Sequence, residues 1–408
     1  MPAISTNSKP QFTDKDLCNL KAIRRFREHL GALLETGEHP LHRSFADPAR
    51  RLLLGDYLSL FLLGLLNPVA RTMRGLVHAS ALTSVQRGIC GRAVSLGSFS
   101  ETQALVDPAL LERMFAELAA ELPDVKNFPR SDVHRFFARD SSLFPALPRM
   151  AWALYGGGRE GFVNNAVRLH VSFDLQKDAP AQARITTGKI CERAALRLDL
   201  AAGSAYVADR YFGEHYALFG ELSAKGCRYI IRLIDHRCTE PQILEEHPIS
   251  EADKACGIER QATVILGKEN KSEALRLIWL RGCTGQLLHI ATNLRPEELS
   301  AGDIALMYKE RWKVEYFFRW VKCLMGCGHW LAESPRGVAV QLYLALIGAL
   351  LLQLELGRRP SKRIWELLQW HLVGMLDQAT LTERLAAQLA SEEASRAKAT
   401  AKKISAKK

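Results

Sequence analysis

The sequence lacks the cysteine patterns of zinc sites and disulfide frameworks. Its 9 cysteines are scattered, odd in number and never spaced as Cys-x2-Cys. Cys323, Cys327 and His329 lie close together, but no second ligand pair accompanies them, so we do not expect zinc. Reduced thiols are the default for such a protein. The first residues, Met-Pro-Ala-Ile-Ser-Thr-Asn-Ser-Lys, hold no apolar core, so we expect no signal peptide.

Long hydrophobic runs are also missing. Residues 52–66 are apolar but are interrupted by Asp56, and residues 338–354 contain Gln341 and Gln353. Both stretches fall short of the roughly 18 apolar residues that indicate a membrane span. Neither is there a long basic amphipathic helix that would suit a membrane surface. We therefore expect buried helices, no membrane partner and a cytoplasmic protein; the family resemblance given below further implies association with the nucleoid.

The composition is that of a globular protein that suits a polyanionic partner. Its 408 residues are 48% hydrophobic and 24% charged, which allows two or three domains and a large core. Lysine and arginine number 55 against 44 acidic residues, a formal net charge of +11. Binding a nucleic acid would use this excess, because each neutralised phosphate releases counterions. Charge alone does not establish such a partner.

The hydrophobic pattern changes several times along the chain. Residues 1–14 are polar and expected to be disordered, residues 15–127 favour helices, and residues 235–302 favour short strands between glycines. Between them, residues 128–234 alternate strands and helices in the order of an α/β domain. The expected strands are Val133–Arg139, Ala166–Leu175, Ala183–Thr187, Ala205–Ala208 and Cys227–Ile234, and the expected helices are 189–198 and 214–225. Residues 303–390 again favour helices, and residues 391–408 form a basic tail that we expect to be disordered.

Four polar residues of different chemistry recur near residue 310. Tyr308, Arg311, Glu315 and Lys322 fall within an arc of about 60° if this run forms one helix. The plain interpretation is the solvated face of an amphipathic helix. A carboxylate between cations and a phenol is also suited to holding a metal and a phosphate. The opposite, apolar side of this expected helix carries Leu306, Phe317, Trp320 and Leu324.

This spacing, Tyr-x2-Arg-x3-Glu-x6-Lys, resembles the Tyr-Arg-Glu-Lys motif of bacterial insertion-sequence DDE transposases. The resemblance implies a ribonuclease-H-like core, preceded by a helical domain that binds element ends and interrupted by a mostly-β insertion domain. It also implies that Glu315 is the third acid of a catalytic triad. Two aspartates are then required upstream, each at the end of a strand. The resemblance is specific over residues 130–330 and is one of general organisation elsewhere.

Two aspartates occur where the resemblance requires them. Asp140, in Phe-Phe-Ala-Arg-Asp-Ser-Ser, is similar to the first motif of the family, and Asp209, in Tyr-Val-Ala-Asp-Arg-Tyr-Phe, to the second. We expect each to close a strand, and the two strands to be parallel neighbours. One departure is that Arg210 follows the second aspartate, where the family commonly has glycine. The rival acids are Asp174, Asp199 and Glu310.

The resemblance implies two-metal chemistry on DNA. Three converging carboxylates repel one another unless metal neutralises them, and Mg²⁺ prefers such oxygen ligands. Two Mg²⁺ ions, for which Mn²⁺ can substitute, would be held by Asp140, Asp209 and Glu315. They would activate water, and then a DNA 3′-hydroxyl, for cleavage and strand transfer.

The partner implied is double-stranded DNA, both element ends and target, bound by a homodimer. Tyr308, Arg311 and Lys322 would bind terminal phosphates, Trp312 would stack on a displaced base, and Arg210 and Arg319 are further phosphate contacts. Two other classes stay open. One is a repurposed or inactive transposase-derived DNA-binding protein. The other is a ribonuclease-H-like repair or resolvase nuclease, which would lack the four-residue spacing and the β insertion.

Overall fold

The computed structural model describes residues 21–38, 41–125, 134–157, 163–234, 241–267, 271–282, 284–323, 326 and 329–405. The polar segment 1–14 therefore lies outside the described residues. The chain forms two compact units, one made of residues 1–118 and 321–408 and the other of residues 119–320. Each unit is described by itself.

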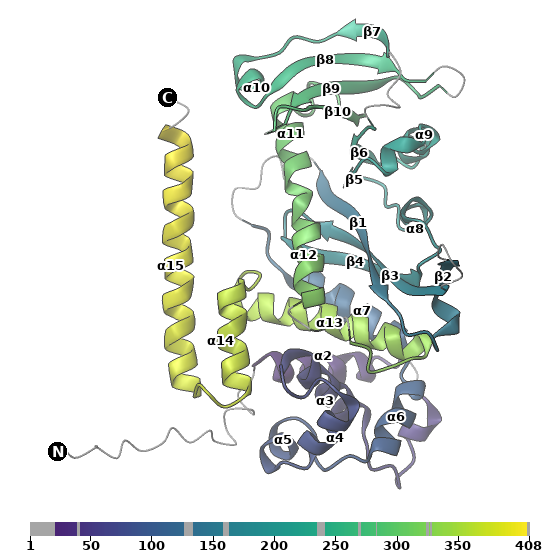
Figure 1. The fold of residues 1–408 in the computed structure, drawn as a ribbon, viewed down its shortest axis with the longest axis vertical. Helices are drawn as coiled ribbons and strands as arrows, with labels where there is room; N and C mark the ends of the chain where they lie inside the picture. Colours follow the sequence, from purple (N-terminus) through teal and green to yellow (C-terminus); the bar gives the residue numbers. More distant parts are fainter. Residues whose placement is uncertain are drawn as a thin grey trace, which may run out of the picture. The chain divides into compact units, whose positions relative to one another are not determined.

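The first unit is helical, as the sequence predicts for residues 15–127 (Figure 1). The pair Asn67-Pro68 predicts the end of a helix, and Asn67 does end α3. Pro108 begins another helix at its first position, where a proline costs no hydrogen bond. The pattern Ser98-x-Ser-Glu101 predicts a helix start at Ser98, but Ser95 accepts the backbone N–H of Ser98 and begins that helix earlier. The N-terminal helices are α2 (Lys21–Glu35), η1 (Arg43–Phe45), α3 (Leu54–Leu66), α4 (Met73–Ser80), α5 (Thr83–Gly88), α6 (Leu96–Leu105) and α7 (Pro108–Glu121).

The longest apolar helix, α13 (Pro335–Leu356), forms part of the core of this unit. It packs against α2, α3 and α6. By length and composition it passes as a membrane span, but 89% of its most apolar window is buried within the protein. Ser334 caps its N-terminus, and Gly357 ends it with a φ of 69°, a conformation that favours glycine. The expectation of a buried core helix is confirmed.

The end of the chain is helical rather than disordered. After α14 (Lys362–Leu372), helix α15 (Gln378–Ser405) packs against it and continues through most of the basic tail. The prediction of a disordered tail is therefore wrong for residues 391–405. Alanine and lysine are frequent in that segment, and both are strong helix formers, so charge did not prevent the helix.

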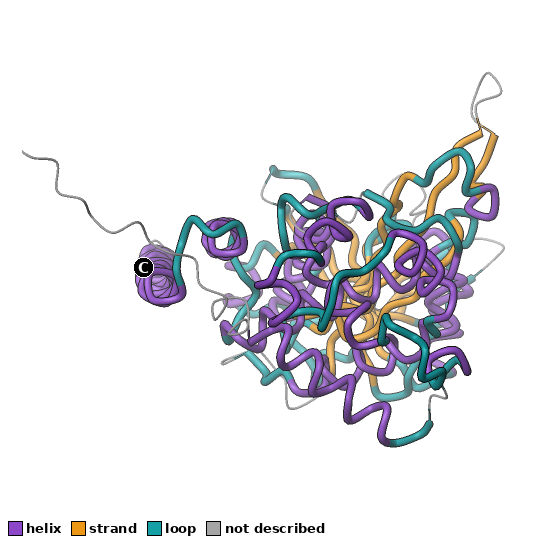
Figure 2. The backbone as a smooth tube through the Cα atoms, turned by 90° about the horizontal axis from the view of Figure 1, so that it is seen from below, coloured by secondary structure: helices purple, strands orange, loops and turns teal. Residues whose placement is uncertain are grey.

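The second unit is built on a single large sheet. The strands order as β2-β3-β1-β5-β6-β10-β9-β8-β7, with β4 paired to β3. In Figure 2 the strands gather in the interior, with helices around them. Within it, β4-β3-β1-β5-β6 has β1, β5 and β6 parallel and β3 antiparallel to β1. This order and these directions are those of a ribonuclease-H-like core, so the predicted fold class is confirmed. The strands of this part are β1 (Arg135–Pro145), β2 (Leu154–Gly157), β3 (Val163–Asp174), β4 (Ala179–Thr187), β5 (Ser204–Ala208) and β6 (Arg228–Arg232).

Five helical segments accompany this sheet: η2 (Ala151–Ala153), α8 (Glu192–Leu198), η4 (Phe212–Glu214), α9 (Ala217–Ala224) and α11 (Ala301–Glu310). A further helix, α12 (Trp312–Cys323), continues from α11. In Figure 1, α8 and α9 lie beside β5 and β6, while α11 and α12 follow each other in one long run along the sheet.

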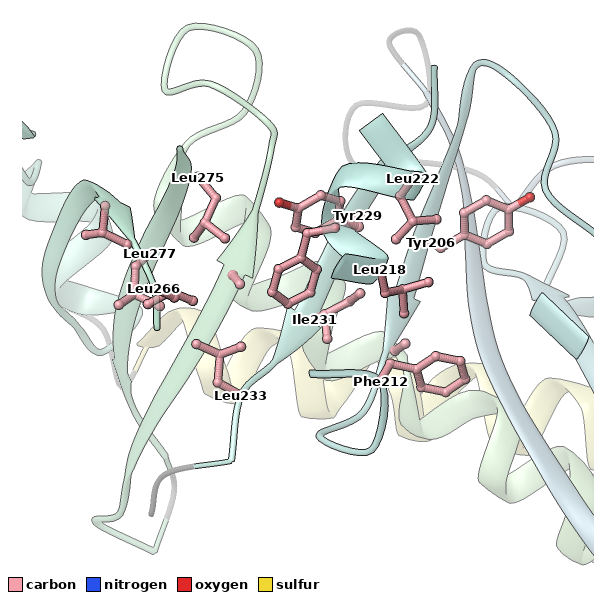
Figure 3. Close-up of a cluster of buried hydrophobic side chains, with 14 of the residues drawn as sticks. Tyr206, Phe212, Leu218, Leu222, Tyr229, Ile231, Leu233, Leu266, Leu275 and Leu277 are labelled. Atoms are coloured by element: carbon pink, nitrogen blue, oxygen red, sulfur yellow. The ribbon is translucent and has the colours of Figure 1, made fainter. Parts of the chain in front are cut away.

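The predicted insertion is mostly β, but it is not a separate lobe. Strand β10 pairs antiparallel with β6, so the insertion extends the sheet of the core. One hydrophobic cluster also runs from Tyr229 and Ile231 of β6 to Leu277 of β9 (Figure 3). The insertion and the ribonuclease-H-like part therefore share one hydrophobic core. Burying each such apolar side chain stabilises the fold by roughly 1.5–3 kcal/mol. The elements of the insertion are β7 (Gln242–Glu246), α10 (Glu251–Ala255), β8 (Ile258–Ile265), β9 (Leu275–Arg281) and β10 (Leu287–Thr292).

The insertion also fixes the start of the helices that follow it. The buried guanidinium of Arg276 donates to the carbonyl oxygens of Leu294 (3.3 Å) and Leu299 (2.7 Å) in the segment before α11. Asp253 of α10 accepts the backbone N–H of Gly302, in the first turn of α11, at 2.7 Å. These bonds satisfy buried polar groups and hold α11 to β9 and α10.

Candidate functional site: two aspartates facing a helix pair

Asp140 and Asp209 lie on neighbouring parallel strands, as predicted. The register pairs Arg139 of β1 with Ala208 of β5, and each aspartate follows directly after. Asp209 follows the end of its strand as expected. Asp140 does not, because β1 continues to Pro145 by pairing with β3. Asp140 instead marks the point at which β1 loses its parallel partner, so the expected strand end is wrong while the expected proximity is confirmed.

Strand alternation places Asp140 on the face that carries α12. Ala138 lies opposite Phe173 of β3, whose ring contacts that of Phe317 of α12 at 5.7 Å. Residues two apart on a strand share a face, so Asp140 faces the same way as Ala138. Arg139 faces the other way, where it donates to Ser172 and to Asp199, the residue that ends α8.

Backbone groups hold both carboxylates. Asp140 accepts the N–H of Ser141 at 2.7 Å, and Asp209 accepts the N–H of Tyr211 at 3.0 Å. The loop after Asp209 then packs so closely on β6 that a Cβ on Gly213 would lie 2.4 Å from the carbonyl oxygen of Arg232. A side chain at position 213 would therefore clash with the backbone of β6.

Asp140 lies in a negative environment. Burial is the main cause that raises its pKa to about 7, and the charge of Glu192 is the next. The charge of Asp209 raises the pKa further, while the N–H of Ser141 and the charge of Arg311 lower it. Ionising Asp140 therefore costs free energy in the folded protein, and a bound cation would offset that cost.

This cost predicts a pH-dependent stability. Above its ordinary pKa of 3.8 the unfolded chain has lost the Asp140 proton, whereas the folded protein keeps it up to about pH 7. Folding therefore binds a proton in that window, and stability falls as the pH rises through it. Asp140→Asn removes this loss. In EDTA at pH 8 we expect the variant to be more stable than the wild type by on the order of 2 kcal/mol, allowing for partial exposure.

At pH 3 the same substitution should have little effect, because both states of the wild type are then largely protonated. Urea unfolding followed by circular dichroism at the two pH values measures the difference. An equal effect of Asp140→Asn at both values would show that the ionised carboxyl is not destabilising in the folded protein.

The helix expected around residue 310 is broken at Arg311. Helix α11 ends at Glu310 and α12 begins at Trp312, and the N–H groups of Arg311 and Val314 bond three residues back rather than four. The prediction of one uninterrupted helix is therefore wrong. The expected burial of Leu306 is also wrong, because this residue is 43% exposed. Phe317 and Trp320 are buried as expected, and Leu324 lies outside the described residues.

The break buries Arg311 and brings it to Glu315. Arg311 is 5% exposed, and its Nη1 forms an ion pair with Glu315 Oε1 at 2.7 Å. Its guanidinium carbon lies 5.7 Å from the ring centre of Tyr308 and 5.2 Å from that of Trp312. Its Nε has no hydrogen-bond partner among the described residues. Burial acts to lower the pKa of Arg311, but Tyr308, Glu315 and Asp140 together raise it.

The structure thus brings five predicted residues into one neighbourhood. Arg311 responds to the charges of Asp140 and Glu315, and the pKa of Tyr308 is raised mainly by burial and further by the charge of Asp209. Helix α11 packs against β5 and β6. Glu315 itself is turned to Arg311. As the side chains stand, no group of three histidine, cysteine or acidic residues that could hold a metal occurs in the described parts of the chain.

The remaining predicted residues lie at the periphery. Trp312 is 50% exposed, and Arg210 is exposed on the loop after Asp209. Arg319 lies over the ring of the exposed Tyr316, with 5.6 Å between its guanidinium carbon and the ring centre. Lys322 lies on α12, seven residues after Glu315. Arg210, Trp312 and Arg319 are therefore exposed to solvent, whereas Lys322 is half-buried on the helix that carries Glu315.

The rival acids are bound elsewhere. Asp174 pairs with Arg135 at 2.7 Å, Asp199 with Arg139 and Arg184, and Glu310 with Lys313 at 2.7 Å. The residue that sequence reasoning missed is Glu192, whose charge acts on Asp140. An acid in the first turn of a helix is common for reasons of the helix dipole, so nothing in the sequence distinguished it.

The comparison with known families agrees with this geometry. Residues 132–352, more than half of the chain, match the family model described as "Transposase DDE domain". The chain belongs to the DDE transposase domain family. It is similar to a putative transposase of Sinorhizobium fredii, with 25% identity over 219 residues, 53% of this chain and 59% of that protein. It is also similar to a probable transposase for the insertion sequence element IS5377 of Geobacillus stearothermophilus, with 29% identity over 217 residues, 50% of this chain and 52% of that protein.

These matches span little more than half the length of the two relatives. Among solved structures, the fold is similar to a piggyBac transposase in a synaptic complex with hairpin DNA. The TM-score is 0.41 and the identity 11%, over 91% of this chain and 80% of that one. The assignment of the chain to the DDE family rests on the match of residues 132–352 and agrees with the strand order of the sheet.

Membership of the DDE family implies a divalent cation, and the donors present fit one in kind. Asp140 and Asp209 offer carboxylate oxygens from adjacent strands, and hard divalent ions prefer such donors. Burial and the charge of Glu192 raise the pKa of Asp140, so the folded protein disfavours the ionised carboxylate. The third donor, Glu315, is engaged by Arg311 and would have to change partner.

Proposed function

We propose that the protein is a DNA transposase of the Tyr-Arg-Glu-Lys branch that cleaves insertion-sequence ends and transfers the freed 3′-hydroxyl into target DNA. The observation that carries the proposal is the placement of Asp140 and Asp209 on adjacent strands, with Asp140 facing the helix that bears Glu315. Asp140, Asp209 and Glu315 are the proposed catalytic acids. When bound to them, Mg²⁺ or Mn²⁺ would activate the attacking oxygen and stabilise the leaving one.

The Arg311–Glu315 pair suggests how DNA completes the site. Arg311 offers a buried Nε without a partner among the described residues, between the rings of Tyr308 and Trp312. A guanidinium binds a phosphate through two parallel hydrogen bonds, which requires it to release some of its hold on a carboxylate. We propose that a DNA phosphate replaces Glu315 on Arg311. Glu315 is then free to turn towards Asp140 and Asp209.

The exposed side chains near this pair form the proposed DNA surface. Trp312 and Tyr316 present aromatic faces, Arg210 and Arg319 supply exposed positive charge, and Lys322 is a half-buried cation on α12. Aromatic rings stack on bases irrespective of sequence, and cations track the backbone. We further propose that the N-terminal helices α2–α7 bind the element ends, and that two copies of the chain act together on DNA in the cytoplasm, at the nucleoid.

The second candidate is a DNA-binding protein derived from a transposase that has lost catalysis. An intact set of three acids argues against it. An assay with a labelled duplex that carries the inverted repeat flanking the gene separates the two. Magnesium-dependent nicking and joining supports the transposase, whereas binding without cleavage supports the alternative.

A further inference from the structure

Glu192 is fixed beside the aspartate pair by a closed set of hydrogen bonds. Its Oε1 accepts from the hydroxyl of Ser141 at 2.5 Å and from Nη1 of Arg168 at 3.3 Å. The same Nη1 of Arg168 also donates to Ser141 at 3.1 Å. Arg168 is itself held by the carbonyl oxygen of Gly188, which its Nε and Nη2 reach at 3.3 and 3.2 Å. The carboxylate at the start of α8 is therefore tied to both β1 and β3.

Glu192 approaches the pair from behind. Ser141 follows Asp140 on β1, so the two side chains point to opposite faces of the sheet. Asp140 faces α12, and Ser141 faces α8. Strand β5 has no residue paired with β1 beyond Ala208, so the sheet is open at this point. Glu192 thus contacts the strand that carries Asp140 without occupying the face on which Asp140 lies.

Glu192 places a carboxylate next to the strand position that carries Asp140. The Ser141 hydroxyl, which donates to Glu192 at 2.5 Å, belongs to the residue that directly follows Asp140 on β1. Asp140 and Asp209 in turn directly follow the last paired residues of β1 and β5. The side chain of Glu192 is 15% exposed. A carboxylate held by the fold against two others is costly in the metal-free protein, and a divalent cation in front of the pair would reverse that cost.

We propose that Glu192 is a positioning residue for the cation site of Asp140 and Asp209. It adds a negative charge behind the pair and, through Ser141, fixes the strand that carries Asp140, and it does not bind the ion. This inference rests on the proposed function, because it takes the two aspartates as cation ligands. A purely structural role, as an ion pair that attaches α8 to the sheet, would leave cation affinity unchanged.

The test is a titration of the full-length protein with Mn²⁺, in which the electron paramagnetic resonance signal reports the free ion. Glu192→Gln keeps the length and an acceptor oxygen for Ser141 and Arg168 but removes the charge. We expect its dissociation constant for Mn²⁺ to rise about tenfold, the usual scale for a residue behind the ligands. Glu221→Gln is the matched control. It removes an exposed carboxylate that pairs with Arg197 of the same helix α8, and its affinity should equal that of the wild type.

Asp140→Asn in the same titration separates the two proposals. If Asp140→Asn binds Mn²⁺ like the wild type, the proposed cation site is wrong. If Asp140→Asn loses binding but Glu192→Gln does not, only the role of Glu192 is overturned. Should Glu192→Gln fail to fold in EDTA, Arg168→Gln decides, because it removes the cation that offsets Glu192. Tighter Mn²⁺ binding by Arg168→Gln supports the proposal, and unchanged or weaker binding contradicts it.

Discussion

Asp140→Ala and Asp209→Ala should each reduce magnesium-dependent cleavage of the element end by roughly a thousandfold or more. A bound metal supplies several kcal/mol of charge stabilisation in the transition state, and each 1.4 kcal/mol is a factor of ten in rate. The two residues sit one register step beyond the last parallel pair of β1 and β5, so neither can replace the other. Single-turnover cleavage of the labelled inverted-repeat duplex measures the rate.

End binding should survive these substitutions, because they remove negative charge and no phosphate contact. Gel-shift affinity in EDTA, where no cleavage occurs, provides that comparison. Asp174→Ala is a poor control because that side chain is buried and paired with Arg135. Glu221→Gln is the better one, and it should cleave like the wild type. Cleavage by Asp140→Ala at even a tenth of the wild-type rate would exclude Asp140 as a cation ligand.

Arg311→Ala and Lys322→Ala should have the opposite signature, with weaker binding of DNA ends even without metal. A hydrogen-bonded charge on a phosphate is worth about 1.5–3 kcal/mol, so affinity should fall by about tenfold or more. Each lost phosphate contact should also lower the slope of log affinity against log salt by about one unit. Fluorescence anisotropy of a labelled end in EDTA, at four or five salt concentrations, gives both quantities.

Arg197→Ala is the matched control for this pair. Arg197 is half-exposed, forms a bidentate pair with Glu221 at the far end of α8 and lies outside the proposed DNA surface. Its removal lowers the net charge by the same amount. If Arg197→Ala reduces affinity and salt slope as much as Arg311→Ala does, the effect is one of overall charge and Arg311 is not a specific phosphate contact.

The sheet and the aspartate pair were accessible from the sequence for a physical reason. The alternation in Ala166–Leu175 and the short apolar runs before Asp140 and Asp209 identify strands, and parallel strands bring equivalent positions to the same edge. The true end of β1 was not accessible. Whether a strand stops at Asp140 depends on its antiparallel partner β3, which pairs with it as far as Pro145.

The helix break at Arg311 could not be predicted from local signals. No glycine or proline interrupts residues 303–323, and every residue there is compatible with a continuous helix. The burial of Arg311 is a tertiary effect, since an arginine on a helix is ordinarily solvated. The contacts of Glu192 were hidden for the same reason, because its partners Ser141 and Arg168 are distant from it in the sequence.

The most direct test of the central claim is a strand-transfer assay with the intact protein. A pre-cut inverted-repeat end with a free 3′-hydroxyl is incubated with supercoiled plasmid and Mg²⁺, and joined products are separated on a gel. The structure predicts joining by the wild type, none in EDTA and none by Glu315→Ala. Cutting without joining would indicate a resolvase-like nuclease, and binding alone a repurposed protein. Joining by Glu315→Ala at the wild-type rate would contradict the assignment of Glu315 as the third acid.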